Sequence, residues 1–253
     1  MTSPLRAARA AFVFLTRIPV GGFPYTPDEW RWASAFFPLV GAVVGGLAAS
    51  VFEGLRPTGT LGAAYFALGA SLLLPGAFHE DGLADTSDAL GGGYDREKVF
   101  AILKDSRIGS FGGAALVVSI AGRAALLAHA GARAIPALVL IGAVARVAPI
   151  WQMVALPYAT PDGAKSRHVA SAGASQALVA STWPLLVGGA LVATRHLEAW
   201  RVGAAFLATG VVAILTGWRF KKRVGGITGD FLGATEQLAE LVGFAVMAWT
   251  VGD

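Results

Sequence analysis

The sequence predicts an all-α protein: a bundle of about seven transmembrane helices with its N-terminus in the cytoplasm. Of its 253 residues, 55% are hydrophobic and only 14% are charged, whereas soluble domains have about a quarter charged residues. The mean hydropathy is +0.61. Several apolar stretches reach the roughly 20 residues that a helix needs to cross a bilayer. Because these stretches and short connections use up the chain, residues 1–253 are interpreted as a single domain.

Residues 1–32 are expected to form an interfacial segment. Arg6 and Arg9 precede a short apolar run, and Arg17 and Pro19 interrupt that run before a cleavage site appears. A removed signal peptide is therefore not expected. An amphipathic helix over residues 4–17 on the membrane surface is preferred to a short re-entrant piece.

Seven apolar stretches then predict the spans. In chain order they are residues 33–51, 60–78, 111–130, 135–156, 177–193, 202–218 and 231–250. Pro184 interrupts the fifth stretch, and Glu236 and Glu240 place charge in the seventh. Ionisable groups inside a membrane are usually functional.

Basic residues predict the orientation. With a cytoplasmic N-terminus, fourteen of the twenty Lys and Arg residues fall in inside segments, among them Lys165 and Arg167. Four fall outside, and Arg123 and Arg146 lie within spans. This asymmetry follows the positive-inside rule. The net charge of +4 therefore reports topology, and no nucleic-acid partner is inferred from it.

Acidic residues gather in one inside connection, residues 79–110. Seven of the sixteen lie between Glu80 and Asp105. The chain has no cysteine, which excludes disulfides, thiolate catalysis and sulfur-ligated metals. Any metal must be held by oxygen or nitrogen ligands.

Three aspartates of this connection share a helix face. Asp81, Asp85 and Asp88 are spaced i, i+4 and i+7, which places them within about 60° of one another. Like charges about 6 Å apart repel by nearly 3 kcal/mol per pair at an effective dielectric near 20, so a cation is expected. Mg²⁺ prefers carboxylate oxygens, either as two ions or as one ion with an outer carboxylate. The alternative is that Asp85 or Asp88 only caps a helix.

Two glycine-containing segments open later spans. Residues 104–113 combine Asp105, Ser106 and Arg107 with small residues before the third span, which suits a phosphate at a helix N-terminus. The alternative is that Asp105 or Ser106 caps the helix and Arg107 is an interfacial anchor. Residues 225–236 form a similar turn before the last span, with Gly229 and Asp230 at its centre.

These blocks resemble the cobalamin synthase family, the adenosylcobinamide-GDP ribazoletransferases, over nearly the whole chain. The resemblance is carried by F-H-x-D-G-L-A-D-x-x-D at residues 78–88, K-D-S-R-I-G at 104–109, G-G-x-T-G-D-x-L-G-A-x-E at 225–236, and F-L-T-R-I-P-V at 14–20. It implies a Mg²⁺-dependent reaction of adenosylcobinamide-GDP with α-ribazole, or its 5′-phosphate. The products would be GMP and adenosylcobalamin, or its 5′-phosphate. Glu80 stands where the family commonly has an apolar residue.

The expected site combines the resemblance with the chemistry above. The metal ligands are expected to be Asp81, Asp85 and Asp88. The catalytic candidates are Asp105, Asp230 and His79, for activating the attacking hydroxyl, and Arg107, for a phosphate. The substrate-binding candidates are Ser106, Arg107, Arg146, Gly229 and Glu236; Arg123 and Glu240 could instead be an interhelical pair.

Two other functions stay open at this point. One is another Mg²⁺-dependent membrane phosphotransferase or prenyltransferase, and the other is a transporter. Transport is disfavoured because the acidic residues crowd the inside ends of the spans. The expected location is the prokaryotic inner membrane, with the lipid bilayer as a partner and the active site on the cytoplasmic side. The oligomeric state stays open, a homo-oligomer included.

Overall fold

The computed structural model describes residues 3–159 and 171–250, and this part of the chain is all-helical, without a strand. Lys165 and Arg167 lie outside the described residues. The longer helices are α1 (Pro4–Leu15), α2 (Pro27–Ala33), α3 (Phe37–Leu55), α4 (Thr60–Leu73), α5 (Phe78–Gly92), α6 (Arg96–Leu103), α7 (Ser110–His129), α8 (Ala134–Ala145), α9 (Val147–Ala155), α11 (Ala174–Ala193), α12 (Ala199–Val224) and α13 (Gly229–Ala248).

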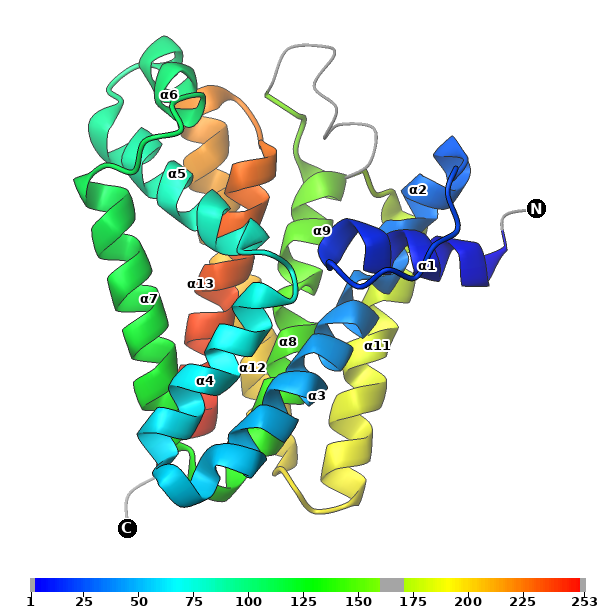
Figure 1. Cartoon of the computed structure of the whole chain (residues 1–253). Helices are drawn as coiled ribbons and strands as arrows, with labels where there is room; N and C mark the ends of the chain where they lie inside the picture. Colours follow the sequence, from blue (N-terminus) through cyan, green and yellow to red (C-terminus); the bar gives the residue numbers. More distant parts are fainter. Residues whose placement is uncertain (1–2, 160–170, 251–253) are drawn as a thin grey trace.

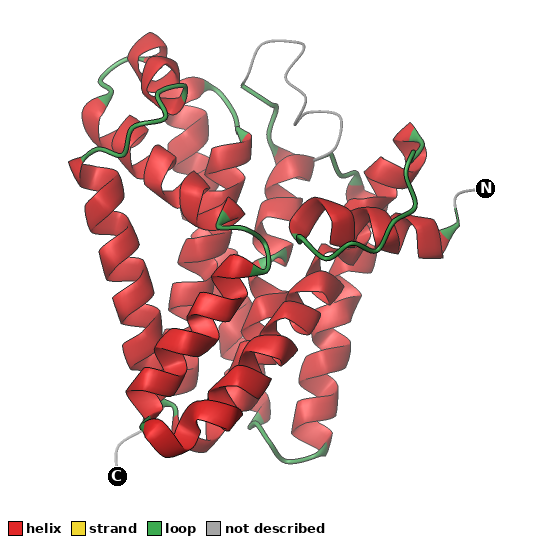
Figure 2. Ribbon diagram, viewed as in Figure 1, coloured by secondary structure: helices red, strands yellow, loops and turns green. Residues whose placement is uncertain are grey.

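Six helical stretches are long and apolar enough to cross a membrane, which confirms six of the predicted spans. They are Pro27–Thr58, Ser110–His129, Gly131–Ala155, Ala174–Ala193, Ala199–Val224 and Gly229–Ala248. Pro184 lies inside α11 without ending it. The helices run side by side as one bundle, with α1 lying across one end of it (Figures 1 and 2).

The predicted second span, residues 60–78, is wrong as a single straight helix. α4 ends at Leu73, and α5 leaves it at an angle of 91°. The break contains Pro75, and both Gly76 and Ala77 have positive φ, 78° and 60°, a region that ends a helix. The 14 residues of α4 extend about 21 Å, too short for a hydrocarbon core of about 30 Å. α4 and α5 are long and apolar enough for a span only when taken together as a bent pair, and much of the predicted 79–110 loop is helical.

The fourth span is also interrupted, at Arg146 between α8 and α9. Pro149 has no N–H, so it cannot donate to the carbonyl of Ala145, and its ring disturbs that turn. The Arg146 side chain instead donates to the carbonyl oxygen of Gly142 at 2.6 Å. The break holds a buried guanidinium in the middle of the bundle.

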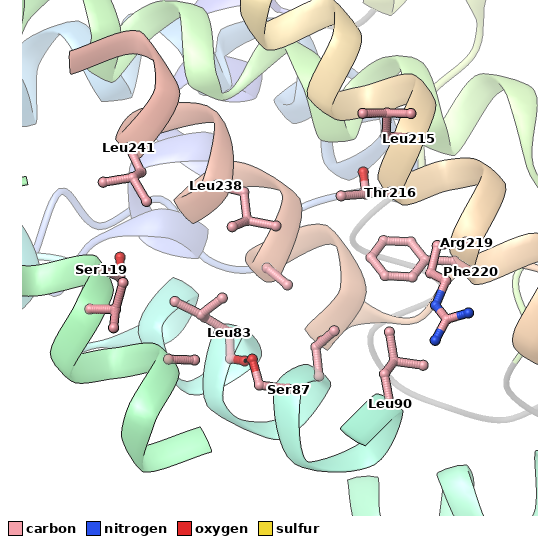
Figure 3. Close-up of a pocket in the computed structure, with 14 residues that line it drawn as sticks. Leu83, Ser87, Leu90, Ser119, Leu215, Thr216, Arg219, Phe220, Leu238 and Leu241 are labelled. Atoms are coloured by element: carbon pink, nitrogen blue, oxygen red, sulfur yellow. Dashed lines mark hydrogen bonds between the residues drawn. The ribbon is translucent and has the colours of Figure 1, made fainter. Parts of the chain in front are cut away.

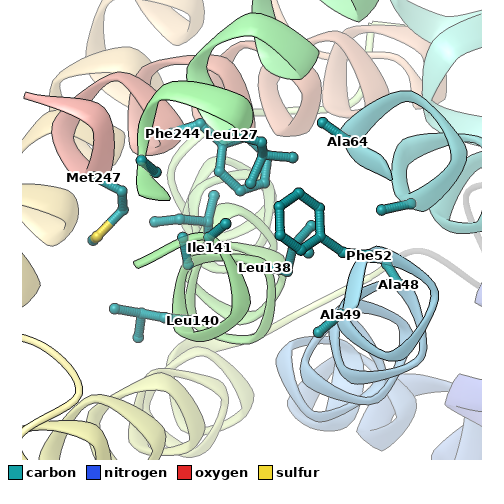
Figure 4. Close-up of a cluster of buried hydrophobic side chains, with 14 of the residues drawn as sticks. Ala48, Ala49, Phe52, Ala64, Leu127, Leu138, Leu140, Ile141, Phe244 and Met247 are labelled. Atoms are coloured by element: carbon teal, nitrogen blue, oxygen red, sulfur yellow. The ribbon is translucent and has the colours of Figure 1, made fainter. Parts of the chain in front are cut away.

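Glycines bring α3 and α8 into close contact. A Cβ added at Gly41 would overlap the carbonyl oxygen of Gly142, and one at Gly45 would overlap that of Leu138. Small residues at such crossings let membrane helices approach closely. Below this crossing, α3, α4, α7, α8 and α13 share an apolar core (Figure 4), which includes Phe52, Leu127, Leu138, Ile141 and Phe244.

The predicted site segments gather at one end of the bundle. In Figure 1, α6, the end of α5, the start of α7 and the end of α12 lie at the end that also carries α1, whereas α13 runs toward the opposite end. α1 buries Ala7, Ala10, Ala11 and Leu15, which share one face. The cytoplasmic orientation of this end stays a prediction from the basic residues.

Candidate active site

The acidic helix α5 packs directly on the first turns of α13. A Cβ added at Gly82 would lie 2.8 Å from the carbonyl oxygen of Asp230 and 3.2 Å from the Cα of Gly233. Only glycine at position 82 permits this approach. The first and third sequence blocks, far apart in the chain, therefore meet at one place.

Asp81, Asp85 and Asp230 form the open part of the site. Asp81 is exposed, and Asp85 and Asp230 are partly buried. The negative charges of Asp81 and Asp230 repel the charge of the Asp85 carboxyl group, and the charge of Asp81 also repels that of Asp230. The repulsion among these carboxylates favours a bound cation.

Asp88, the third predicted metal ligand, contacts the start of α7. Its Oδ2 accepts a hydrogen bond from the backbone N–H of Gly109 at 2.7 Å, and its Oδ1 accepts one from Gly112 at 2.8 Å. Both donors belong to the first turn of α7, where backbone N–H groups lack helical partners. Asp88 is only 9% exposed. It caps α7 across a tertiary contact, and its role as a metal ligand stays a prediction.

The loop before α7 holds Asp105, Ser106 and Arg107 at the surface. The Arg107 guanidinium donates to Asp105, with Nη2–Oδ2 at 2.6 Å, and this hydrogen bond lowers the pKa of Asp105 to about 2. A carboxylate so stabilised is a weak proton acceptor. Neither Asp105 nor Ser106 caps α7, because Gly109 occupies the N-cap position and Asp88 supplies the acceptor. Ser106 and Arg107 are exposed and accessible to a ligand.

Below the acidic face lies a buried ionic cluster. Arg146 Nη1 is 3.1 Å from Glu236 Oε1, and His79 Nδ1 is 3.7 Å from Glu236 Oε2. These side chains are 4%, 1% and 7% exposed, respectively for Arg146, Glu236 and His79. The structure thus brings three predicted site residues together, but it places them beneath the open carboxylates.

Arg123 joins three helices in the same cluster. Its Nη1 lies 2.6 Å from Glu240 Oε2 on α13, and its Nη2 lies 3.5 Å from Glu80 Oε1 on α5. The interhelical pair anticipated for Arg123 and Glu240 is confirmed. Glu80 was not singled out as its second partner, since its position off the aspartate face gave no sign of a buried arginine on α7.

A small cavity of about 50 Å³ adjoins the cluster. It is lined by His79, Arg146, Gly229, Gly233 and Glu236, together with Phe14, Phe37 and Phe78. Arg146 Nε is buried without a hydrogen-bond partner, and Glu236 Oε1 has only its ion-pair contact with Arg146 Nη1. Because a cavity of this size with such groups can hold ordered water, we expect hydration here.

Three sets of hydrogen bonds hold the glycine-rich turn before α13. Ile227 donates to the carbonyl oxygen of Pro157 at 2.9 Å and accepts from Ala159 at 2.8 Å. Thr228 caps α13 by accepting from Phe231. Arg223 donates to the carbonyl oxygens of Leu90 and Gly93 at the end of α5. Nothing local in the sequence identifies carbonyl partners of Arg223 that are so distant in the chain.

Within the described residues, no group of three or more His, Asp or Glu side chains is placed to hold a metal ion. Two carboxylates of one helix face remain available, those of Asp81 and Asp85, with Asp230 beside them. Mg²⁺ in phosphoryl-transfer sites is usually held by one or two carboxylates plus substrate phosphates and water. The donor set fits Mg²⁺ that arrives with a phosphate ligand.

The chain is similar to known proteins over nearly its whole length. A family model described as cobalamin-5-phosphate synthase matches residues 7–248. An adenosylcobinamide-GDP ribazoletransferase of Leptothrix cholodnii is 39% identical over 100% of this chain and 98% of its own length. Those of a Polaromonas species and of Allorhizobium ampelinum are 35% and 38% identical, over 94% and 93% of both chains. No solved structure matches.

Proposed function

The chain belongs to the cobalamin-5-phosphate synthase family, and from this membership we infer that it is an adenosylcobinamide-GDP ribazoletransferase. It is an integral membrane enzyme that joins α-ribazole to adenosylcobinamide-GDP and releases GMP, the final stage of nucleotide-loop assembly. The relatives that carry this name match nearly the whole chain.

The observation that supports the site is the contact of α5 with α13. It places the open carboxylates Asp81 and Asp85 beside Asp230. We propose that Asp81 and Asp85 hold Mg²⁺ against the pyrophosphate of adenosylcobinamide-GDP. When bound, the ion supplies neutralisation of phosphate charge. The packing of α5 on α13 holds both aspartates near Asp230.

Transfer requires a ribose hydroxyl of α-ribazole to lose its proton as it attacks the phosphorus attached to cobinamide. GMP leaves with the electrons of the broken phosphoanhydride bond. Of the three predicted proton acceptors, Asp105 is weakened by Arg107, and His79 faces Glu236 in the buried cluster. Asp230 is the proposed acceptor because it is partly open and lies beside Asp81.

Phosphate recognition is assigned to the loop before α7. Arg107 offers a guanidinium fork, which is suited to bidentate contact with phosphate oxygens. Ser106 and Arg107 are exposed in this loop, and Asp88 fixes its last residue, Gly109. Charge on the transferring phosphate is stabilised by such prepositioned donors.

Arg146, Glu236 and Gly229 are assigned a supporting role. The two charged side chains pair with each other and are almost fully buried. They hold the first turns of α13, on which Asp230 stands, in a fixed relation to α9 and α5. We place the acidic face on the cytoplasmic side of the inner membrane, on the strength of the basic residues near it, such as Lys104, Arg107 and Lys221.

The test is release of GMP from adenosylcobinamide-GDP by the purified protein in vesicles, with and without α-ribazole and Mg²⁺. Release should require all three components. Asp81→Asn and Asp85→Asn should each abolish it without changing the elution volume of the protein. Glu97→Gln, an exposed acid on α6, is the matched control and should keep activity. Normal turnover in either aspartate variant would remove the metal assignment.

The competing membrane transferases are tested by substrate replacement. A CDP-alcohol or prenyl diphosphate donor should give no product with this protein, and α-ribazole 5′-phosphate should be compared with α-ribazole as the acceptor. Transport predicts solute flux in sealed vesicles without GMP release. Family membership supports the ribazoletransferase over both alternatives.

A further inference from the structure

A groove of about 400 Å³ opens on the side of the bundle, between α7 and α12 and over α5 and α13 (Figure 3). Its walls include Leu83, Leu215, Leu238 and Leu241. Two lining residues, Val118 and Leu215, are 65% and 60% exposed. Because α7 and α12 are membrane spans, the groove opens toward lipid. We name it the α7–α12 groove.

Five polar residues line this otherwise apolar groove: Thr86, Ser87, Ser119, Thr216 and Arg219. Arg219 is its one charged lining residue, and within the described part of the chain it has no acidic partner. Thr86 and Ser119 are 6% and 4% exposed, and the hydroxyl oxygen of each is buried without a hydrogen-bond partner. Unpaired buried hydroxyls are costly, so they indicate a polar ligand group that pairs with them.

We propose that the α7–α12 groove binds one anionic phospholipid, with its phosphate at Arg219 and an acyl chain along the leucine walls. Arg219 lies in the last turns of α12, next to Lys221 and Lys222, at the end where the predicted inside basic residues gather. Basic positions between membrane helices on the cytoplasmic side recognise anionic headgroups. The volume is in the range of sites for drug-sized ligands, large enough for a chain segment and a glycerol ester.

This lipid would contact the acidic helix α5 on the face that lines the groove. The groove is floored by Leu83, Thr86 and Leu90 of α5, whereas Asp81 and Asp85 project from other positions of the same helix. A lipid in the groove therefore stabilises the placement of α5 without touching the carboxylates. The inference goes beyond the proposed reaction, because lipid binding requires neither substrate nor metal.

The test uses detergent-purified protein, without substrate, titrated with phosphatidylglycerol or with phosphatidylcholine of the same acyl chains. Retained lipid is counted by native mass spectrometry. The wild type should prefer phosphatidylglycerol, and Arg219→Gln should lower that preference by about fivefold, the effect of one basic residue near an anionic headgroup. Lys222→Gln is the matched control, since Lys222 is a basic residue of the same turn that does not line the groove.

A second variant pair tests the groove itself. Val118→Trp should fill the groove and lower retention of both lipids, whereas Val117→Trp, equally exposed at 68% but outside the lining, should not. Equal lipid retention by wild type, Arg219→Gln and Val118→Trp would overturn the proposal. Preferential binding of inorganic phosphate over phospholipid would also overturn it. The same holds if the protein forms a dimer that Val118→Trp dissociates and that added lipid does not affect. GMP release plays no part in this readout, so failure of the proposed function would leave the result interpretable.

Discussion

Replacement of Asp88 tests whether this carboxylate caps α7 or binds metal. Each of its oxygens accepts one backbone N–H, at 2.7 Å from Gly109 and 2.8 Å from Gly112. Hydrogen bonds to a charged group contribute about 1.5–3 kcal/mol each. Gly109 is exposed, so water replaces its lost partner, whereas Gly112 is buried. We therefore expect Asp88→Ala to lower the free energy of unfolding by about 2–4 kcal/mol, and Asp88→Asn, which keeps one acceptor oxygen, by about half as much.

The assay pairs thermal unfolding with a Mg²⁺ titration of GMP release. For a chain of this length, about 1 kcal/mol shifts the melting temperature by roughly 2–4 °C, so Asp88→Ala should melt about 4–16 °C lower. Asp88→Asn should lower the maximal rate, because the loop that carries Arg107 loses its anchor, yet keep the wild-type Mg²⁺ requirement. A Mg²⁺ requirement raised about tenfold with an unchanged melting temperature would refute the capping role and restore Asp88 as a ligand.

Three further outcomes follow from the same contacts. Arg123→Met removes the ion-pair partner of Glu80 and leaves Glu240 only its longer contact with Arg146, at 3.7 Å, which should cost about 3–5 kcal/mol; adding Glu240→Gln should recover part of this in thermal unfolding, and a single variant as stable as wild type would contradict the pairing. Gly82→Ala places a Cβ 2.8 Å from the Asp230 carbonyl oxygen, so α5 must shift on α13: GMP release should fall at least about tenfold and the free energy of unfolding by about 1–3 kcal/mol; normal activity would contradict the tight contact. Asp105 has its pKa lowered to about 2 by Arg107, so their pairing is present above about pH 4 and is lost only as the pH falls through about 2. Asp105→Asn should then change the rate of GMP release without changing the shape of its pH profile between about pH 5 and 9; a lost acidic limb would identify Asp105 as the base.

Hydropathy predicts most of this fold because burial in lipid depends on composition over about 20 residues. Six spans are confirmed on that basis, including α13 with its two glutamates. The bend between α4 and α5 was missed, since the apolar run continues through Pro75 to Phe78 and hydropathy does not report backbone direction. The positive φ of Gly76 and Ala77 is a conformational property that the run of hydrophobic residues conceals.

The candidate site was predicted in its residues more than in its contacts. Helical spacing correctly places Asp81 and Asp85 on one face, because that depends only on local geometry. The cap formed by Asp88, and the pairing of Glu80 with Arg123, depend on how α5 meets α7. No local sequence pattern predicts how these two helices pack against each other. The same limit applies to Arg223, whose partners lie at the far end of α5.

The dependence of α5 on α13 has a consequence for biogenesis. Gly82 rests on Asp230, and the ribosome makes the second of these residues on the order of ten seconds after the first, at about 5–20 residues per second. Until α13 has entered the bilayer, the acidic helix has its contact with α7 but lacks the one with α13. Maturation of catalytic competence is therefore a late, cooperative event of membrane insertion, and a ribosome that stalls before α13 leaves a protein that is embedded but inert.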